Sequence, residues 1–178
     1  CTPTARSPSP GPPRRAARVG ELFHAWLERR FEAAPALLED PDSEWHADAD
    51  LARLVAAFEA GPFAERVPHA TEVPFSLFLA GQVVRGRIDA VFTDRGRPEV
   101  VDWKTGRLPS DPARLDAMAV QLAMYRLALL RMPRFSDVPR VDAEFYFVGS
   151  DESWRPQSLP GEDEILSWMI GTERRPAH

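Results

Sequence analysis

Apolar residues recur with helical spacing in three long segments of the chain. Over residues 18–33 they fall at i, i+3, i+4 and i+7, the pattern of one buried face on an amphipathic helix. Residues 47–60 repeat this pattern and stop at Gly61 and Pro62, which is typical of a helix end. Residues 113–131 roughly keep the same spacing. We therefore predict helices over all three segments.

Four shorter segments combine β-branched and aromatic residues with turn residues at their ends, which is typical of strands. They cover residues 70–79, the run that ends at Phe92, the run from Val100 to Lys104, and residues 141–148. Only short turns separate the first three, so we expect an antiparallel meander. The fourth strand follows the third helix, and a short helix is expected over residues 163–171. The predicted core order is helix, three strands, helix, strand.

The two ends of the chain lack these patterns. Residues 1–17 are rich in proline, which is not tolerated inside a packed helix, so they are predicted to be a linker. Residues 173–178 are predicted to be a loose tail. The stretch between them, residues 18–172, is long enough for one domain with its own hydrophobic core.

The composition is that of a soluble globular protein. Of the 178 residues, 44% are hydrophobic and 28% are charged. No apolar run approaches the ~20 residues that span a bilayer, and no signal-peptide pattern opens the chain. The one cysteine excludes an internal disulfide, which fits a reducing compartment. We therefore expect a cytoplasmic protein that does not enter a membrane.

The formal net charge of −5 is unexpected for a protein that binds DNA by itself, because contact with phosphate depends on basic patches. The charge does not exclude such a function. Carboxylates that hold a metal count as negative here, although a bound cation neutralises them in use. A partner protein could also supply most of the basic contacts.

Two of the predicted strands each carry a carboxylate. Asp89 lies in one, and Asp102 lies in the next, with Lys104 two residues further on. Residues two apart in a strand point to the same face, so Asp102 and Lys104 should project together and Trp103 to the opposite face. If the strands are adjacent, Asp89 can lie beside Asp102. Two carboxylates and an ammonium on one face suit a hard divalent cation and a water held beside a phosphate.

An ordinary alternative for an Asp-x-Lys pair at a strand end is a solvated ion pair. Here the pair follows the apolar Val100 and Val101, as a buried strand requires, and precedes Thr105 and Gly106. This context favours a site placed at the end of a core strand.

Four short motifs occur in order along the chain: Gly-x-x-x-His, Gly-x-x-Asp, Asp-x-Lys-Thr-Gly and Gln-x-x-x-Tyr. They run from Gly20 to His24, from Gly86 to Asp89, from Asp102 to Gly106, and from Gln121 to Tyr125. Over residues 18–150 the chain thereby resembles the RecB-like branch of the PD-(D/E)XK nuclease superfamily. The resemblance implies a mixed α/β (α+β) fold with a restriction-endonuclease-like core. That core is a mixed central sheet flanked by helices, in the order αβββαβ with extra helices.

The resemblance also implies a chemical role for several residues. Asp89 and Asp102 would hold Mg²⁺ or Mn²⁺ through oxygen, with His24 and the backbone carbonyl of Trp103 as further ligands. Lys104 would orient or deprotonate the attacking water. A lone helical histidine is more often structural than a ligand, but the motif and the later carboxylates favour the ligand role for His24.

Two further groups of residues complete the expected site. Gln121 and Tyr125 lie four apart on one helical face and belong to the implied catalytic set, although ordinary helix packing is an alternative, especially for Tyr125. Glu72 would bind a second metal or a water, or would be a surface carboxylate at a strand edge. Arg85 and Arg87 would meet DNA phosphate, with a solvated side chain as the alternative for Arg85.

These features predict a Mg²⁺- or Mn²⁺-dependent deoxyribonuclease, exonuclease or endonuclease, that acts in DNA repair or recombination. The resemblance implies DNA and a UvrD/RecB-type ATP-dependent DNA helicase as partners, the helicase in the same full-length chain. Several relatives hold an iron–sulfur cluster with four cysteines, but this sequence has only Cys1, so no cluster is expected.

Two other classes of protein remain as alternatives. One is a non-catalytic DNA-channel or docking module that retains the nuclease fold. The presence of every expected chemical residue argues against it, since a degenerate copy would lose Asp or Lys. The other is a zinc hydrolase, but neither a His-x-x-x-His motif nor paired-cysteine spacing occurs.

Overall fold

The computed structural model of the protein describes residues 12–32 and 48–173. The chain divides into two compact units, Cys1–Val55 and Ala56–His178. Among the described residues, none of the helices is both long and apolar enough to cross a bilayer.

The first unit contains helix α1, Pro12–Glu32, and the start of α2, Ala49–Ala60. Helix α1 begins earlier than predicted, so the assignment of residues 12–17 to a linker is wrong. The physical reason is that proline is accepted in the first helical turn, where the amide hydrogen that it lacks has no partner in any case. The predicted linker residues 1–11 and tail residues 174–178 lie outside the described residues.

Side-chain contacts fix the start of α2. The Asp48 Oδ1 atom accepts hydrogen bonds from the backbone amides of Asp50, at 2.9 Å, and Leu51, at 3.4 Å. These two bonds hold the pKa of Asp48 below its usual value. Asp48 is therefore the N-cap of this helix, one residue before its first turn. The Arg15 Nη2 atom of α1 lies 2.9 Å from Asp50 Oδ2.

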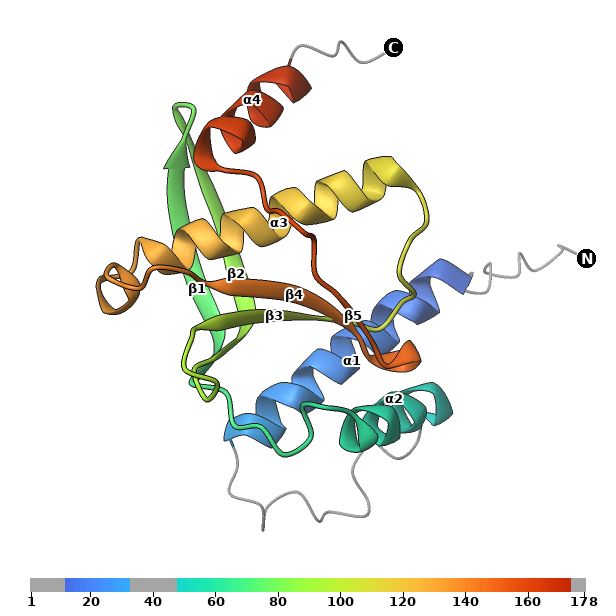
Figure 1. Ribbon diagram of the computed structural model, residues 1–178. Coiled ribbons are helices and arrows are strands. Elements are labelled where there is room, and N and C mark those ends of the chain that lie inside the picture. Colours follow the sequence, from blue (N-terminus) through green and yellow to red (C-terminus); the bar gives the residue numbers. More distant parts are fainter. Residues whose placement is uncertain (1–11, 33–47, 174–178) are drawn as a thin grey trace, which may run out of the picture. The chain divides into compact units, whose positions relative to one another are not determined.

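A five-stranded mixed sheet forms the second unit, in the order β1-β2-β3-β4-β5 (Figure 1). The strands are β1, Ala70–Leu79; β2, Gln82–Phe92; β3, Glu99–Lys104; β4, Asp142–Phe147; and β5, Glu152–Trp154. All neighbouring strands are antiparallel except β3 and β4, which are parallel and are connected through helix α3, Pro112–Leu130. The predicted meander, helix and fourth strand are therefore confirmed. The short β5 was not predicted.

Helix α3 covers one face of the sheet. Its buried residues are Val120, Leu122, Ala123, Tyr125, Ala128 and Leu129. Leu122, Tyr125 and Leu129 pack with sheet residues such as Ile88, Val100 and Phe145. Ala123 and Ala128 belong to a second cluster with Leu77 and Leu79 of β1. Two short 3₁₀ helices, η3 (Pro133–Phe135) and η4 (Val148–Ser150), flank β4.

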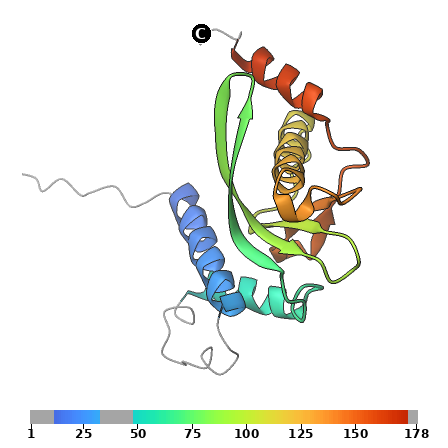
Figure 2. The ribbon, with the colours of Figure 1, turned by 90° about the vertical axis from the view of Figure 1, so that its left-hand side faces the viewer.

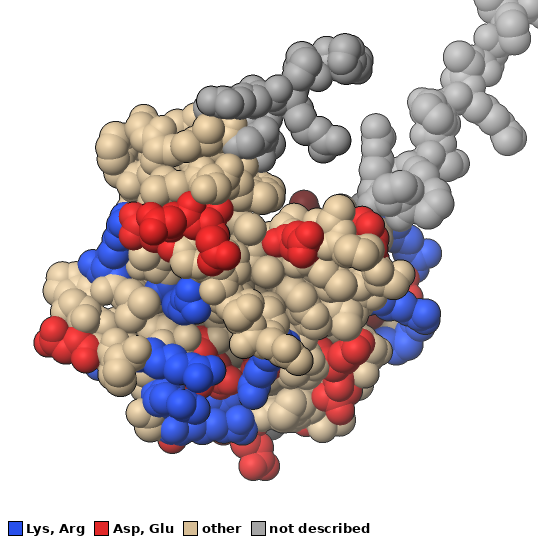
Figure 3. Space-filling model, turned by 45° about the horizontal axis from the view of Figure 1, so that its top comes forward, with Lys and Arg blue, Asp and Glu red and all other residues tan. Residues whose placement is uncertain are grey.

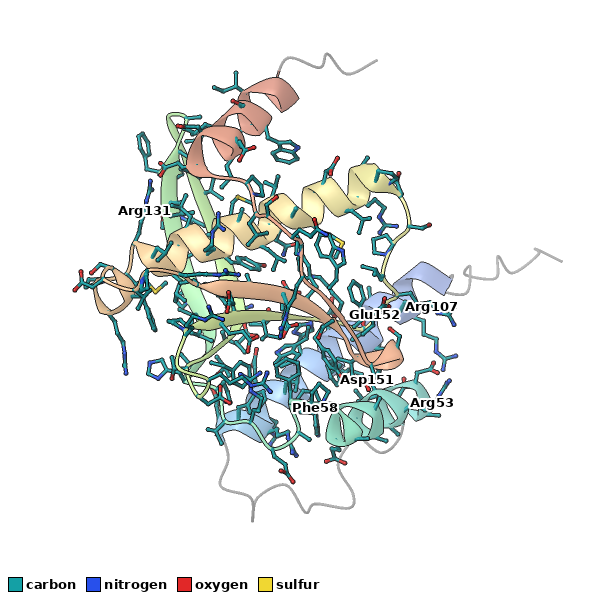
Figure 4. All side chains as sticks on the ribbon, in the orientation of Figure 1. Arg53, Phe58, Arg107, Arg131, Asp151 and Glu152 are labelled. Atoms are coloured by element: carbon teal, nitrogen blue, oxygen red, sulfur yellow. The ribbon has the colours of Figure 1, made fainter. Side chains whose placement is uncertain are left out.

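The β1–β2 hairpin is a long curved ribbon that extends beyond β3, with helix α4 (Glu162–Glu173) near its tip (Figure 2). The hairpin turns at Ala80 and Gly81, whose positive φ values of 48° and 78° match a tight two-residue turn. Ile165 of α4 is buried against Leu77 and Leu79 of β1. Arg131, directly after the last residue of α3, forms an ion pair with Glu162 at the start of α4 (Figure 4). This pair connects the two helices.

The other face of the sheet carries an aromatic cluster and a line of paired charges. Trp103 packs edge-on against Phe58 and Phe63, with ring centroids 5.5 and 5.0 Å away. The fully buried Glu144 accepts two hydrogen bonds from Arg155, at 2.7 and 2.8 Å. Because a charge at this depth needs a partner, the Arg155 contact fixes the segment after β5 on the sheet.

Candidate active site

Strand β3 presents the Asp-x-Lys pair on the face covered by α3. The Lys104 Nζ atom lies 2.6 Å from Asp102 Oδ2 and 4.7 Å from the centre of the Phe145 ring. Asp102 is buried, while the Lys104 side chain is 33% exposed. Trp103 joins the aromatic cluster on the opposite face, so the predicted alternation of Asp102, Trp103 and Lys104 is confirmed. Of this ion pair, Lys104 is therefore the solvent-accessible member and Asp102 the buried one.

Helix α3 holds Asp102 from the other side. Gln121 Nε2 donates to Asp102 Oδ1 at 3.2 Å and to the Tyr125 hydroxyl oxygen at 2.6 Å. The Tyr125 hydroxyl donates to the same Oδ1 atom at 3.1 Å. Burial, followed by the nearby Asp102 charge, raises the pKa of Tyr125, so this hydroxyl stays protonated and keeps its donor role. Gln121 and Tyr125 therefore fix the orientation of the Asp102 carboxylate.

Asp89 reaches the same place because strands β2 and β3 separate there. Their backbone pairing extends from Phe92↔Glu99 to Ala90↔Val101. Beyond it, the Trp103 amide donates to the side chain of Asp89, at 2.9 Å from Oδ2. A carboxylate thus replaces the backbone partner in the ladder, and this brings Asp89 beside Asp102.

The regular alternation of side chains between the two faces of the sheet is interrupted in β2 at this point. Ile88 and Val91 both lie in the apolar cluster under α3, although residues three apart in a regular strand face opposite ways. Glu72 lies opposite Asp89, between the pairs Thr71↔Ala90 and Val73↔Ile88, and has a left-handed φ of 49°. A non-glycine residue in this region costs about 1–3 kcal/mol and is often found at functional sites. The strain at Glu72 therefore coincides with the point where the sheet opens.

Glu72 adds a third carboxylate to the site. One of its oxygens lies within 4.8 Å of an oxygen of Asp89. The Arg87 Nε atom lies 2.7 Å from Glu72 Oε2. Burial, and secondarily the Asp102 charge, raises the pKa of Asp89 to about 8, while the Trp103 amide and Lys104 oppose the shift. Crowded carboxylates whose repulsion Lys104 only partly offsets form a donor set that fits a divalent cation.

This electrostatic arrangement predicts a pH-dependent stability of the metal-free protein. In the folded state Asp89 keeps its proton up to a pH of about 8, whereas an unfolded aspartate loses it near its ordinary value of 3.8. The folded state therefore binds more protons in this window, and its stability should fall as pH rises, by at most about 1.4 kcal/mol per pH unit from this group.

Urea unfolding in EDTA between pH 5 and pH 8 measures this effect. Repeating the series with saturating Mn²⁺ should remove the decline, because the cation replaces the proton. A decline of equal size in the Asp89→Asn variant would show that other groups cause it.

Sequence reasoning did not identify Phe75, which supports the site from β1. Phe75 lies opposite Gly86 in the register and edge-on to Tyr125, with ring centroids 5.8 Å apart. A Cβ atom at Gly86 would lie 2.5 Å from the Phe75 ring, so any larger residue here would have to displace that ring. The glycine of the Gly-x-x-Asp motif therefore has a packing role, and a glycine inside a strand was the available signal.

We expect Gly86→Ala to lower the free energy of unfolding by about 1–3 kcal/mol, because the added methyl group displaces the Phe75 ring. Chemical denaturation measures this loss. Gly106→Ala is the matched control, since a Cβ at Gly106 meets no atom within 4 Å and the loop should accept it. Equal losses in the two variants would contradict the packing role.

The remaining predicted residues lie in two places. Arg85 and Arg87 are exposed on β2. His24 is half-buried on α1, with its ring 6.3 Å from that of Phe23. Helix α1 belongs to the unit Cys1–Val55 and the carboxylates belong to Ala56–His178, so metal ligation by His24 stays a prediction.

Comparison with known proteins identifies the family. The model of the PD-(D/E)XK nuclease superfamily matches residues 4–169. The chain therefore belongs to the PD-(D/E)XK nuclease superfamily, and its mixed sheet with flanking helices is consistent with that fold.

Similar proteins share shorter or more distant regions with this chain. The Gene 69 protein of Mycobacterium phage L5 is 43% identical over 60 residues, which is 34% of this chain and 21% of that protein. The Gene 69 protein of Mycobacterium phage D29 is 44% identical over 55 residues, which is 31% of this chain and 20% of that protein. The chain thus matches about a fifth of the length of these relatives.

One solved structure shares the fold. It is a crystal structure of a candidate exonuclease from Eubacterium rectale, with a TM-score of 0.52 and 12% sequence identity. The match covers 86% of this chain and 63% of that one. At this identity the likeness concerns the fold alone.

Proposed function

We propose that this chain is a metal-dependent deoxyribonuclease module that hydrolyses phosphodiester bonds. Its active site would be formed by Asp89, Asp102 and Lys104. The observation that carries the proposal is the convergence of the buried Asp102 carboxylate, the half-buried Asp89 carboxylate and one partly exposed ammonium where β2 and β3 separate. The family is one of nucleases, and every chemical residue of its motifs is present.

Asp89 and Asp102 would hold Mg²⁺ or Mn²⁺, with the Trp103 carbonyl and His24 as further ligands and Glu72 beside a second ion or a water. When bound, the cation would neutralise charge on the phosphate oxygens and make a nearby water more acidic. Gln121 and Tyr125 would keep Asp102 in its binding orientation through the Oδ1 contacts.

Lys104 is the residue placed to act on the water. Its ammonium lies beside Asp102 and is accessible from solvent. The ammonium would orient the attacking water and offset the negative charge that grows on the phosphate in the transition state, whereas the neutral amine form of Lys104 would accept the proton of the water. The water oxygen then forms the new bond to phosphorus as the bond to the leaving oxygen breaks.

The proposed context is a helicase-nuclease in which a UvrD/RecB-type helicase delivers DNA to this module during repair or recombination. The net charge of −5 supports a need for such help, since DNA affinity depends on basic contacts. Basic side chains nevertheless gather in groups on the face drawn in Figure 3 instead of mixing evenly with the acidic ones. The module would supply a few local contacts with DNA, and the helicase would supply most of the DNA affinity.

Incubation of the purified chain with end-labelled single- and double-stranded DNA tests the proposal. We expect cleavage with Mg²⁺ or Mn²⁺ and none in EDTA. Binding of DNA without cleavage under every metal condition would instead support the non-catalytic DNA-channel or docking module.

A further inference from the structure

One face of the β1–β2 hairpin points away from the helices that cover the other face. Phe75, Leu77 and Leu79 of β1 pack into the apolar clusters with α3 and α4. Exposed residues of the opposite face form what we call the outer strip: Ser76 and Phe78 of β1, and Val83, Arg85 and Arg87 of β2. In this strip Ser76 pairs with Arg85, and Phe78 pairs with Val83.

The outer strip is basic along its middle. Arg85 and Arg87 lie two residues apart and therefore on the same face of β2, about 7 Å from each other along the strand. Arg87 is engaged by Glu72, whereas no carboxylate among the described residues pairs with Arg85. None of the five strip residues is acidic, so the strip complements an anion.

The tip of the strip is apolar and open to solvent. Phe78 is 68% exposed and Val83 is 55% exposed, and the two lie directly opposite each other. An aromatic ring next to arginines is the combination that binds an unpaired nucleic acid strand, with bases stacked on the ring and phosphates on the cations. A duplex hides the flat faces of its bases, so it could use the arginines but not the ring.

The strip lies on the same strand as Asp89 and leads toward this carboxylate. Along β2, Arg87, Arg85 and Val83 lie two, four and six residues from Asp89, so the tip is about 20 Å from the carboxylate. We infer that the outer strip is a track that guides a single-stranded nucleic acid to the site, with Arg87 and Arg85 on successive phosphates and Phe78 stacked on a base. This inference rests on the proposed function, since it names the form of substrate that the same site receives.

Fluorescence anisotropy in EDTA tests the track without requiring cleavage. The probe is a labelled oligothymidylate of about 15 nucleotides, within the usual length range for such sites. We expect Arg85→Gln combined with Phe78→Ser to raise the dissociation constant about tenfold or more. Arg85→Gln alone should also reduce the slope of log affinity against log salt by about 0.7, the value for one phosphate contact in a single strand. Phe78→Ser alone should weaken binding and leave that slope unchanged.

The control combines Arg134→Gln with Val67→Ser, which removes one arginine charge and one exposed apolar side chain at positions outside the strip. It should bind the oligonucleotide like the wild type. Equal weakening by the control, or unchanged binding by the strip variant, would overturn the track. So would an equal loss of affinity for a duplex of the same length, or a wild-type dimer that Phe78→Ser dissociates in sedimentation.

A small substrate separates this inference from the proposed function. Thymidine 5′-(p-nitrophenyl phosphate) is too short to extend from the metal site to the apolar tip of the strip, about 20 Å away. Its hydrolysis with Mn²⁺ therefore reports on the metal site without the tip. We expect the wild type to hydrolyse this ester with Mn²⁺. If the wild type does not hydrolyse it or DNA, the proposed function fails, while the binding measurements still decide the track.

Discussion

Lys104→Ala should reduce DNA cleavage by at least 100-fold while leaving the fold and metal affinity close to those of the wild type. The ammonium is the group that would steer the water proton and offset phosphate charge, and general acid–base catalysis typically contributes 10²–10⁴-fold. Lysine is not a metal ligand here, so its loss should not weaken metal binding. Single-turnover cleavage of end-labelled DNA in saturating Mn²⁺ measures the rate, and titration calorimetry measures the metal affinity.

Arg107→Ala is the matched control for Lys104→Ala. Arg107 is an exposed cation on the connection from β3 to α3, close to the motif in sequence but outside the hydrogen-bonded site (Figure 4). Its removal should leave the cleavage rate near that of the wild type. Wild-type cleavage by Lys104→Ala would show that another group activates the water.

Asp89→Asn should greatly weaken metal binding. It should also raise the stability of the metal-free protein. The amide oxygen of asparagine can still accept the Trp103 hydrogen bond, so the separation of β2 and β3 should persist. The negative charge is lost, and Mn²⁺ affinity should fall by 100-fold or more. Because Asp89 is ionised only against burial and a neighbouring carboxylate, the metal-free variant should melt at a higher temperature than wild type at pH 8.

Thermal unfolding of both proteins with and without Mn²⁺ measures these two effects together. The wild type should gain stability from the metal, and Asp89→Asn should not. A metal-free variant that is less stable than the wild type at pH 8 would contradict this account. It would show that the Asp89 carboxylate stabilises the metal-free fold, instead of destabilising it.

The helical spacing of apolar residues predicted the main helices, and short runs of β-branched and aromatic residues between turn residues predicted four of the strands. The alternation of side chains along a strand also placed Asp102 and Lys104 on one face and Trp103 on the other, a consequence of strand geometry alone. The start of α1 was misjudged because prolines look the same in a linker and in a first helical turn. Strand β5 was missed because three residues carry too little pattern.

The position of Asp89 could not be derived from alternation. The strands change facing at Asp89 and Glu72, and the left-handed φ of Glu72 is not encoded by its residue type. The Asp102 contacts of Gln121 and Tyr125 depend on where α3 crosses the sheet, which is a tertiary property. The four motifs supplied these residues, and the geometry now gives two of them a definite task in orienting Asp102.

The central claim is that Asp89 and Asp102 share a divalent cation. A crystal soaked in Mn²⁺ and measured for anomalous scattering tests it most directly. We predict one strong peak about 2.0–2.3 Å from an oxygen of each aspartate, with a His24 nitrogen as a further ligand. A peak bound by neither aspartate, or no peak at saturating Mn²⁺, would contradict the claim.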